Sequence, residues 1–288
     1  MATVNPSHSN NTVDPNVNTP IDQAVMPEHN HPIVGDRVIE GDGTSQDAWQ
    51  NWQGLQVLPR LNIAKRFLPH QRVCVFAPHP DDEILGCGGM LQQLAENGNS
   101  ILLVHVTNGT QSHPDSQIYP PQTLDVIRPQ ESLAALEVLG ITEQVSIISL
   151  DLSDGDVFAE QDKFNEKLAT IIQPDDILVT PFMRDGHPDH EATGQVVAAF
   201  AKQHNLDCYQ VLIWAWHWAK PADDRIPWDS AVRLDLSAEQ LARKTQAIDC
   251  FASQTTVDES TGNPPILSAQ TIARISQLWE VYLYESLR

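Results

Sequence analysis

The chain has little positive charge. Lysine and arginine together number 17, whereas aspartate and glutamate number 38, so the formal net charge is −21 at pH 7 and the pI is near 4.6. A surface this acidic repels the phosphates of nucleic acids and of anionic lipids. We therefore expect neither nucleic acid nor an anionic membrane surface as a partner.

Cysteine and long apolar runs are also scarce. The four cysteines lie far apart without a Cys-x-x-Cys pair, which excludes a disulfide framework and is typical of a reducing compartment. No apolar run reaches the length of a membrane span, and the N-terminus has neither the basic nor the apolar region of a secretory signal. The sequence therefore predicts no integral membrane segment and a cytoplasmic location, and it leaves the oligomeric state undetermined.

Composition divides the chain into a tail and one domain. Residues 1–45 are rich in Asn, Pro, Thr, His and Gly with little periodicity, so we expect a disordered N-terminal tail. Residues 46–288 are long enough to bury one large core. An apolar series with three-residue spacing begins at Trp49 and is interrupted at Pro59, which predicts a short helix and a further turn packed on the domain.

Short apolar segments alternate with amphipathic ones along the domain. Strands are expected near residues 73–77, 101–106, 145–149, 176–180, 209–216 and 232–236. Helices are expected near residues 84–97, 123–139, 160–172, 190–204, 238–251 and 268–287. This alternation predicts βαβ units with right-handed crossovers, hence an α/β fold with a mostly parallel central sheet.

The fifth predicted strand ends in the run Trp214-Ala-Trp-His-Trp218. Its alternation with period two places three indoles on one face, where most of their surface packs in the core. His217 then points to the other face near the end of the strand, where it can enter a site.

The first predicted strand leads into a concentration of polar groups. The run from Val73 to Ala77 stops at Pro78 and Pro80, because proline cannot continue a strand ladder. One imidazole and three carboxylates follow within a single turn before a helix begins: His79, Asp81, Asp82 and Glu83. Helix capping accounts for one or two of these acids. It does not account for the whole group at the carboxyl end of a strand, where open α/β sheets bind their ligands.

A second cluster has the same context. The segment Asp185-Gly-His-Pro-Asp-His-Glu191 follows the strand near 176–180 and precedes a helix. Two such strand ends can face each other across neighbouring strands, and imidazole and carboxylate together suit zinc held by three protein ligands. A third His-Pro-Asp, at His113, lies in a polar loop. Residue types alone leave open whether Asp81 or Asp82 binds the metal.

These motifs resemble the zinc-dependent de-N-acetylases of the LmbE or PIG-L type. The resemblance rests on Pro78-His-Pro-Asp-Asp-Glu83, on Gly86-Cys-Gly-Gly89 and on Gly186-His-Pro-Asp-His190. It extends to Val106-Thr-Asn-Gly109 and Asp154-Gly155, and covers roughly residues 70 to 255. It implies a Rossmann-like three-layer sandwich, with residues 46–288 as the catalytic domain, and an enzyme that removes acetyl from N-acetylglucosamine-containing substrates.

The resemblance also implies roles for individual residues. The metal ligands are His79, Asp82 and His190. Asp81 is the general base beside the metal, and His187 donates to the developing oxyanion or protonates the leaving amine. Asp189 orients His187, as a carboxylate does for a catalytic histidine.

Substrate contacts are expected along the same edge of the sheet. Arg128 matches an arginine that binds sugar hydroxyls, although a surface ion pair with Glu131 is its alternative. Asp154 resembles a further hydroxyl ligand, and Asn108 follows the second strand where it can line the cleft. His217 completes this expected substrate-binding set.

The sequence thus predicts a hydrolase that uses Zn²⁺, with Fe²⁺ as the alternative metal, to deacetylate an N-acetylglucosamine-type amino sugar or glycoconjugate. The substrate is a small molecule or a lipid-linked sugar. A metal-dependent amidase acting on a thiol conjugate is the alternative within the same chemistry. A phosphoesterase is disfavoured by the acidic charge and by the lack of a second ligand cluster. A noncatalytic sugar- or metal-binding module predicts the loss of a site residue, yet every matched motif position is filled.

Overall fold

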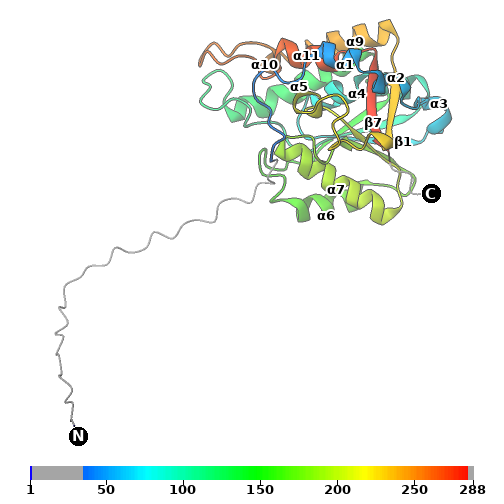
Figure 1. Cartoon of the computed structure of the whole chain (residues 1–288), viewed down its shortest axis with the longest axis horizontal. Coiled ribbons are helices and arrows are strands. Elements are labelled where there is room, and N and C mark those ends of the chain that lie inside the picture. The colour runs from blue at the N-terminus through cyan, green and yellow to red at the C-terminus, as the bar shows by residue number, and fades with distance from the viewer. Residues whose placement is uncertain (2–34, 285–288) are drawn as a thin grey trace.

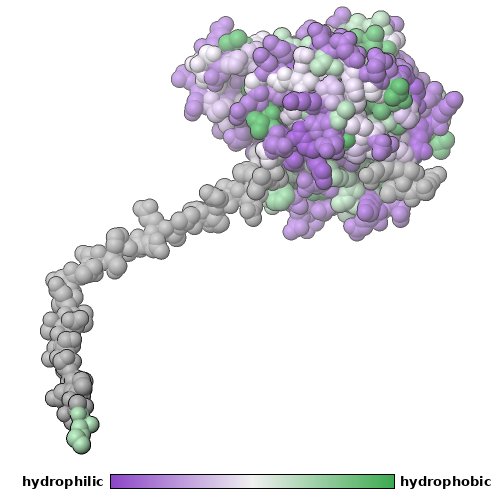
Figure 2. Space-filling model, in the orientation of Figure 1, coloured by the Kyte–Doolittle hydropathy of each residue, from purple (hydrophilic) through white to green (hydrophobic). Residues whose placement is uncertain are grey.

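The computed structural model describes Met1 and residues 35–284. Most of the predicted disordered tail therefore lies outside the described residues. Figure 1 shows a three-layer arrangement, in which helices cover both faces of a central sheet. Figure 2 shows that hydrophilic side chains dominate one face of the molecule, with hydrophobic residues scattered among them. Within the described part of the chain, no helix combines the length and the apolar character that crossing a membrane requires.

The sheet has seven strands in the order β3-β2-β1-β4-β5-β7-β6. Strands β1 to β5 are parallel to one another, whereas β7 runs antiparallel to both β5 and β6. The strands are β1 (Arg72–Ala77), β2 (Ser100–His105), β3 (Val145–Ser149), β4 (Ile177–Pro181), β5 (Cys208–Val211), β6 (Ala231–Asp235) and β7 (Trp279–Tyr284). The α/β class and the mostly parallel sheet predicted from the sequence are confirmed.

Two hydrophobic cores lie on opposite faces of the sheet. Alternate residues of β1 divide between them, with Val73 and Val75 on one face and Cys74 and Phe76 on the other. The first face is covered mainly by α1 (Gln46–Asn51), α4 (Asp82–Glu96), α5 (Pro121–Leu139), α9 (Ala238–Ile248) and α11 (Ala269–Ile275), and the second by α6 (Gln161–Ile171) and α7 (Pro188–His204). The shorter helical elements are α2 (Gln53–Val57), α3 (Ile63–Arg66), α8 (Ala215–Trp218), α10 (Ala252–Thr255) and the 3₁₀ turn η1 (Trp228–Ser230).

The fifth strand is shorter than predicted. It ends at Val211, and the tryptophan-rich run forms α8 instead of continuing as a strand. The cause is a distant side chain: the backbone N–H groups of Ile213, Trp214 and Ala215 all donate to the carboxylate of Asp185. The predicted two-residue alternation of the three indoles is therefore wrong.

The predicted C-terminal helix over 268–287 is also wrong for most of its length. Helix α11 ends at Ile275, and β7 then inserts between β5 and β6. The sequence of β7, Trp-Glu-Val-Tyr-Leu-Tyr, is rich in aromatic and branched residues that favour strands. Backbone pairing on both sides fixes this segment as a strand.

A buried polar contact sets the position of α4, which carries part of the first motif. The Glu280 carboxylate of β7 accepts hydrogen bonds from the backbone N–H groups of Gly89 and Met90 at 2.7 and 2.9 Å, and from Lys244 Nζ at 2.7 Å. A Cβ atom at position 89 would collide with Leu236 and reach Glu280 Oε1 at 3.0 Å. A side chain at this position would therefore displace Leu236, and glycine avoids that displacement.

Candidate active site

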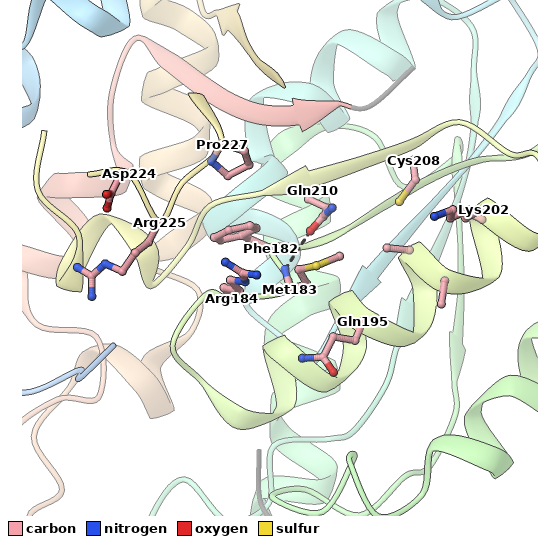
Figure 3. Close-up of a pocket in the computed structure, with 13 residues that line it drawn as sticks. Phe182, Met183, Arg184, Gln195, Lys202, Cys208, Gln210, Asp224, Arg225 and Pro227 are labelled. Atoms are coloured by element: carbon pink, nitrogen blue, oxygen red, sulfur yellow. Dashed lines mark hydrogen bonds between the residues drawn. The ribbon is translucent and has the colours of Figure 1, made fainter. Parts of the chain in front are cut away.

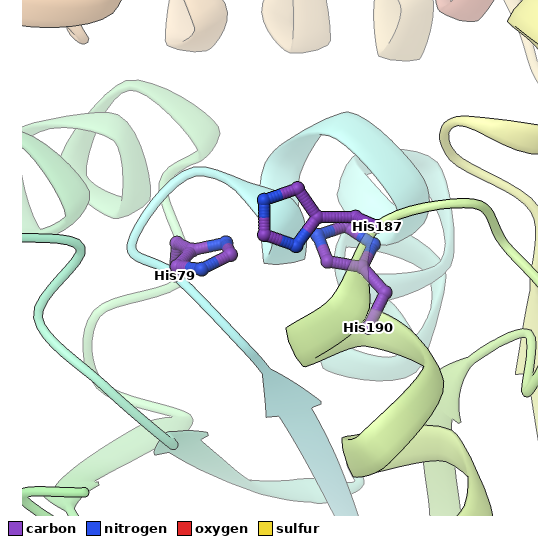
Figure 4. A group of neighbouring side chains, drawn as sticks. All are labelled: His79, His187 and His190. Carbon is purple, nitrogen blue, oxygen red and sulfur yellow. The ribbon is translucent and has the colours of Figure 1, made fainter. Parts of the chain in front are cut away.

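The two sequence motifs meet because their strands are neighbours. Strand β1 pairs in parallel with β4, so the loops at their carboxyl ends lie side by side. Figure 4 shows His79 reaching from the loop after β1 toward His187 and His190, which stand at the start of α7. The centroid of the His79 ring lies 4.9 Å from that of His187 and 5.5 Å from that of His190.

The Asp82 carboxylate lies between two of these imidazoles. Its Oδ2 atom is 3.2 Å from Nδ1 of His79 and 3.1 Å from Nε2 of His190. The same oxygen accepts the backbone N–H of His79 at 3.0 Å, which fixes the turn. All three side chains are buried. Two nitrogens and one oxygen thus converge from distant parts of the sequence.

The environment of His190 favours a positive charge at this point. Its Nδ1 is 2.8 Å from Oδ2 of Asp185, and because a carboxylate only accepts, Nδ1 carries the proton. The buried Nε2 atom has no hydrogen-bond partner among the described residues and faces the Asp82 oxygen. Burial lowers the pKa of His190, but the charges of Asp82 and Asp185 and the hydrogen bond that Nδ1 donates to Asp185 outweigh it and raise the pKa to about 9. A cation placed between His190 Nε2 and the Asp82 oxygen would find a lone pair on each atom.

Two overlapping groups of described residues have the spacing of a metal site. His79, His187 and His190 form one group, and His79, Asp154 and Asp189 form the other, with the ligand atoms of each within 4.8 Å of one another. Imidazole and carboxylate are ligands that suit zinc and ferrous iron. The cluster is therefore a candidate metal centre. His79 is common to both groups, His190 belongs to the first, and the predicted ligand Asp82 belongs to neither.

Asp81 is held at both its backbone and its side chain. It is the N-cap residue of α4 with φ 149° and ψ −31°, a conformation that costs a non-glycine residue about 1–3 kcal/mol. Glu83 Oε2 accepts its backbone N–H at 3.0 Å, and the Ser132 hydroxyl donates to the other oxygen of Glu83. Arg128 Nη2 donates to Asp81 Oδ2 at 2.8 Å. Burial raises the pKa of Asp81 to about 7, against the opposing charge of Arg128.

His187 is placed to act as a neutral donor. It is the N-cap residue of α7, and its Nδ1 accepts the backbone N–H of Asp189 at 3.3 Å. Its Nε2 therefore carries the proton in the neutral ring. Burial lowers the pKa of His187 well below its usual range, and the neighbouring His79 and His190 lower it further.

The sequence predicts that the Asp189 carboxylate orients His187. The structure instead places this carboxylate against His79 and Gly155. Its Oδ2 lies 3.2 Å from Nε2 of His79 and accepts the backbone N–H of Gly155 at 2.8 Å. Because Asp189 lies in the first turn of α7, its side chain turns toward the loop after β3. Asp154, on that loop, also reaches His79 Nε2, at 3.1 Å.

The structure brings some predicted substrate-binding residues into the site and leaves others out. Arg128 and Asp154 line the cavity beside the histidines, although Arg128 also donates to the carbonyl oxygens of Pro80 and Gly109. Asn108 is not among the lining residues, and its amide donates to Asp125. His217 is buried elsewhere, between Arg274 Nη2 at 2.8 Å and the Glu40 carbonyl oxygen at 3.0 Å. It lies outside the cavity because α8 is helical.

The cavity at this site has a volume of about 290 Å³. Its lining combines acids and imidazoles with apolar side chains. The lining residues are His79, Asp81, Asp82, Leu85, Gln111, Ser112, Arg128, Asp154, Gly155, His187, Trp214, Gln254, Ile266 and Leu267. A polar ligand with a small apolar group fits such a lining.

A larger cavity of about 540 Å³ lies between α7 and the loop 224–227. Figure 3 shows Gln195 and Lys202 on α7 and, beyond Phe182 and Met183, Arg225 and Pro227. None of the predicted catalytic or metal-binding residues lines this cavity. We therefore place the candidate active site at the smaller cavity, where the titratable groups converge.

Asp185 was assigned no role from the sequence. It is fully buried and links the His190 imidazole to the loop that carries Trp214, a residue of the cavity wall. Its place in the second motif, five residues before His190, was the available signal. The loop contacts could not be read from the sequence.

Two curated proteins are similar to this chain in sequence. A diacetylchitobiose deacetylase of Thermococcus kodakarensis is 26% identical over 139 residues, which cover 46% of this chain and 50% of that protein. A probable N-acetyl-alpha-D-glucosaminyl L-malate deacetylase 2 of Bacillus subtilis is 28% identical over 134 residues, which cover 44% of this chain and 59% of that protein. The chain thus spans about half the length of the curated relatives that it matches.

Solved structures share the fold. The crystal structure of a deacetylase complex from the teicoplanin biosynthesis pathway superimposes with a TM-score of 0.55 and 21% identity, covering 74% of this chain and 97% of that one. Residues 74–201, which contain both motifs, match the family model described as "PIG-L: GlcNAc-PI de-N-acetylase". Residues 74–201 of the chain are therefore similar to a PIG-L (LmbE-like) family domain.

Proposed function

We propose that the protein is a zinc-dependent hydrolase that removes an acetyl group from an N-acetylglucosamine-type amino sugar or glycoconjugate. The observation that carries the proposal is the Asp82 oxygen 3.1 and 3.2 Å from nitrogens of His190 and His79, in a cavity that also holds Asp81 and His187. Both curated relatives are named as deacetylases of amino-sugar compounds, which supports the same reaction here.

His79, Asp82 and His190 would hold the metal. Bound there, zinc supplies Lewis acidity that polarises a carbonyl and lowers the pKa of water to about 7. His187 is better suited to donate a hydrogen bond than to bind metal, because its Nδ1 is engaged with the Asp189 backbone. Ferrous iron suits the same ligands and is the alternative metal.

Asp81 acts as the general base. Its ionised carboxylate accepts a proton from the attacking water as the new C–O bond forms at the acetamide carbonyl. His187 donates from Nε2–H to the oxygen on which negative charge develops. When the C–N bond breaks, Asp81 returns its proton to the departing nitrogen, so the products are acetate and the free amine. Arg128, paired with Asp81 at 2.8 Å, holds the carboxylate in place.

The test is acetate release from a panel of N-acetylglucosamine compounds, including a lipid-linked one, with zinc and with a chelator. We expect turnover with zinc that the chelator abolishes. Asp81→Asn should lose turnover while zinc stays near one per chain, because Asp81 is not a metal ligand. Wild-type turnover by that variant would contradict the general-base assignment. Hydrolysis of thiol-conjugated amides alone, or sugar binding without hydrolysis, would replace the proposal with one of its alternatives. The cytoplasmic location stays a prediction.

A further inference from the structure

The nine residues 36–44, here called the N-terminal strap, lie against the loops that form the site. The strap precedes α1 and lies outside the segment that matches the family model. Figure 1 shows it in blue, rising from the neighbourhood of α7 toward α11. The Glu40 carbonyl accepts from His217 of α8, and the Asp42 carbonyl accepts from Arg274 of α11 at 2.6 Å. The sequence groups these residues with the tail, because their composition gives no sign of such contacts.

One strap residue contacts the second motif directly. The guanidinium of Arg37 forms a two-pronged pair with Glu191, with Nε–Oε1 at 2.8 Å and Nη2–Oε2 at 2.9 Å. The side chain of Glu191 is 3% exposed and that of Arg37 is 17% exposed. A carboxylate as buried as this requires a charged partner, and the planar fork of arginine matches both of its oxygens. Lysine could provide only a single point charge.

Glu191 also contacts the loop before His187. Its Oε1 also accepts the backbone N–H of Gly186 at 3.0 Å. Gly186 has φ +98°, and a Cβ atom there would lie 2.7 Å from the Trp218 ring and 2.9 Å from the Arg37 carbonyl oxygen. Glycine has wide backbone freedom, so its orientation depends on what surrounds it. Here the Arg37 carbonyl oxygen and the Glu191 carboxylate lie on two sides of Gly186 and restrict its orientation.

We propose that Arg37 is a positioning residue for His187, acting through Glu191 and the backbone of Gly186. The inference rests on the proposed function, in which His187 donates to the developing oxyanion. His187 follows Gly186 directly, so a rotation of the Gly186 peptide moves the imidazole relative to Asp81 and the substrate carbonyl. The N-terminal strap then contributes to catalysis by fixing the position of His187.

The test compares Arg37→Ala with Asp36→Ala, a matched control in the same strap. Asp36 pairs with Arg225 at 2.7 Å and does not touch Glu191 or Gly186. In Arg37→Ala we expect kcat to fall by about 10- to 100-fold, the scale of loss for a displacement of order 1 Å, with KM nearly unchanged. Hydrogen exchange of the Gly186 amide should become faster in the same variant. Arg37→Lys should recover part of both properties, and Asp36→Ala should alter neither.

The outcomes separate the two proposals. Wild-type kcat in Arg37→Ala, an equal loss in Asp36→Ala, or a loss without faster exchange at Gly186 would each overturn the positioning role. If Arg37→Ala does not fold, Arg37→Lys carries the same comparison. If the wild-type protein releases acetate from no compound, the proposed function fails, and exchange at Gly186 alone decides whether Arg37 fixes this loop.

Discussion

Replacing Asp185 with asparagine is expected to weaken metal binding without removing a ligand. The Asp185 carboxylate accepts four hydrogen bonds: Oδ1 from the amides of Ile213 and Ala215, and Oδ2 from Trp214 N and His190 Nδ1. An asparagine has one accepting oxygen, so one side of this arrangement must lose its acceptor.

The two orientations of the introduced side-chain amide have different consequences for His190. With its oxygen toward Ile213 and Ala215, the NH₂ group faces His190 Nδ1, so the imidazole shifts its proton to Nε2 and loses the lone pair that faces Asp82. That orientation leaves one backbone amide, of Trp214, without an acceptor, at about 1–3 kcal/mol. The opposite orientation keeps the metal-binding tautomer but leaves two backbone amides without acceptors. Metal binding must therefore shift the asparagine from the first orientation to the second. This shift costs roughly 1–3 kcal/mol and lowers the metal affinity by a factor of about 5 to 150.

The assay is zinc affinity by competition with a chelating dye, together with thermal unfolding of the metal-free protein. Asp176→Asn is the matched control. Asp176 is also buried and accepts from Arg72 and from Gln173 N, but it lies at the other end of β4. Both variants should unfold at lower temperature, and only Asp185→Asn should bind zinc more weakly. Unchanged zinc affinity in Asp185→Asn would refute the tautomer argument.

Three further predictions follow from buried contacts. Glu83→Ala removes the acceptor of the Asp81 backbone N–H, so kcat should fall by about 10- to 100-fold at unchanged zinc content; normal steady-state rates would show that Asp81 needs no such support. Arg128→Met should lower kcat more than it raises KM, because the guanidinium is paired with Asp81; a rise in KM alone would instead favour a sugar contact. Lys244→Met leaves the Glu280 carboxylate buried without its cation and should cost about 3–5 kcal/mol, with each kcal/mol lowering the melting temperature by roughly 2–4 °C, so an unaltered melting curve would contradict it.

Much of the fold could be predicted because local patterns decide it. The parallel strands are short apolar runs followed by helices with regular periodicity, and β3 falls where the sequence predicts it. Ser237 forms a capping box with Gln240 at the start of α9, a signal contained in four consecutive residues. The errors at 209–216 and 268–287 have a different origin. Asp185 and the flanking strands β5 and β6 determine those segments, and both are distant in sequence.

The candidate site shows the same division. The convergence of the two motifs could be predicted, since each follows one of two strands that a parallel sheet can place together. The choice of His79, Asp82 and His190 within these motifs came from the family resemblance. The hydrogen-bond partners of individual side chains could not be predicted. Asp189 turns to His79 instead of His187, and His217 lies against the strap, because both depend on how loops fold over the sheet edge.

The adjacency of β1 and β4 separates the residues proposed to bind the metal from the residues that would contact the substrate. The atoms proposed to hold the cation come from the loop after β1 and from the first turns of α4 and α7, the helices that follow these two paired strands. Much of the remaining wall lies outside the sheet, with Gln111 and Ile266 in connecting segments and Gln254 in the short helix α10. Insertions or replacements in those segments can change which molecule enters while the proposed metal ligands keep their positions. A protein organised in this way can acquire new substrates through its periphery alone.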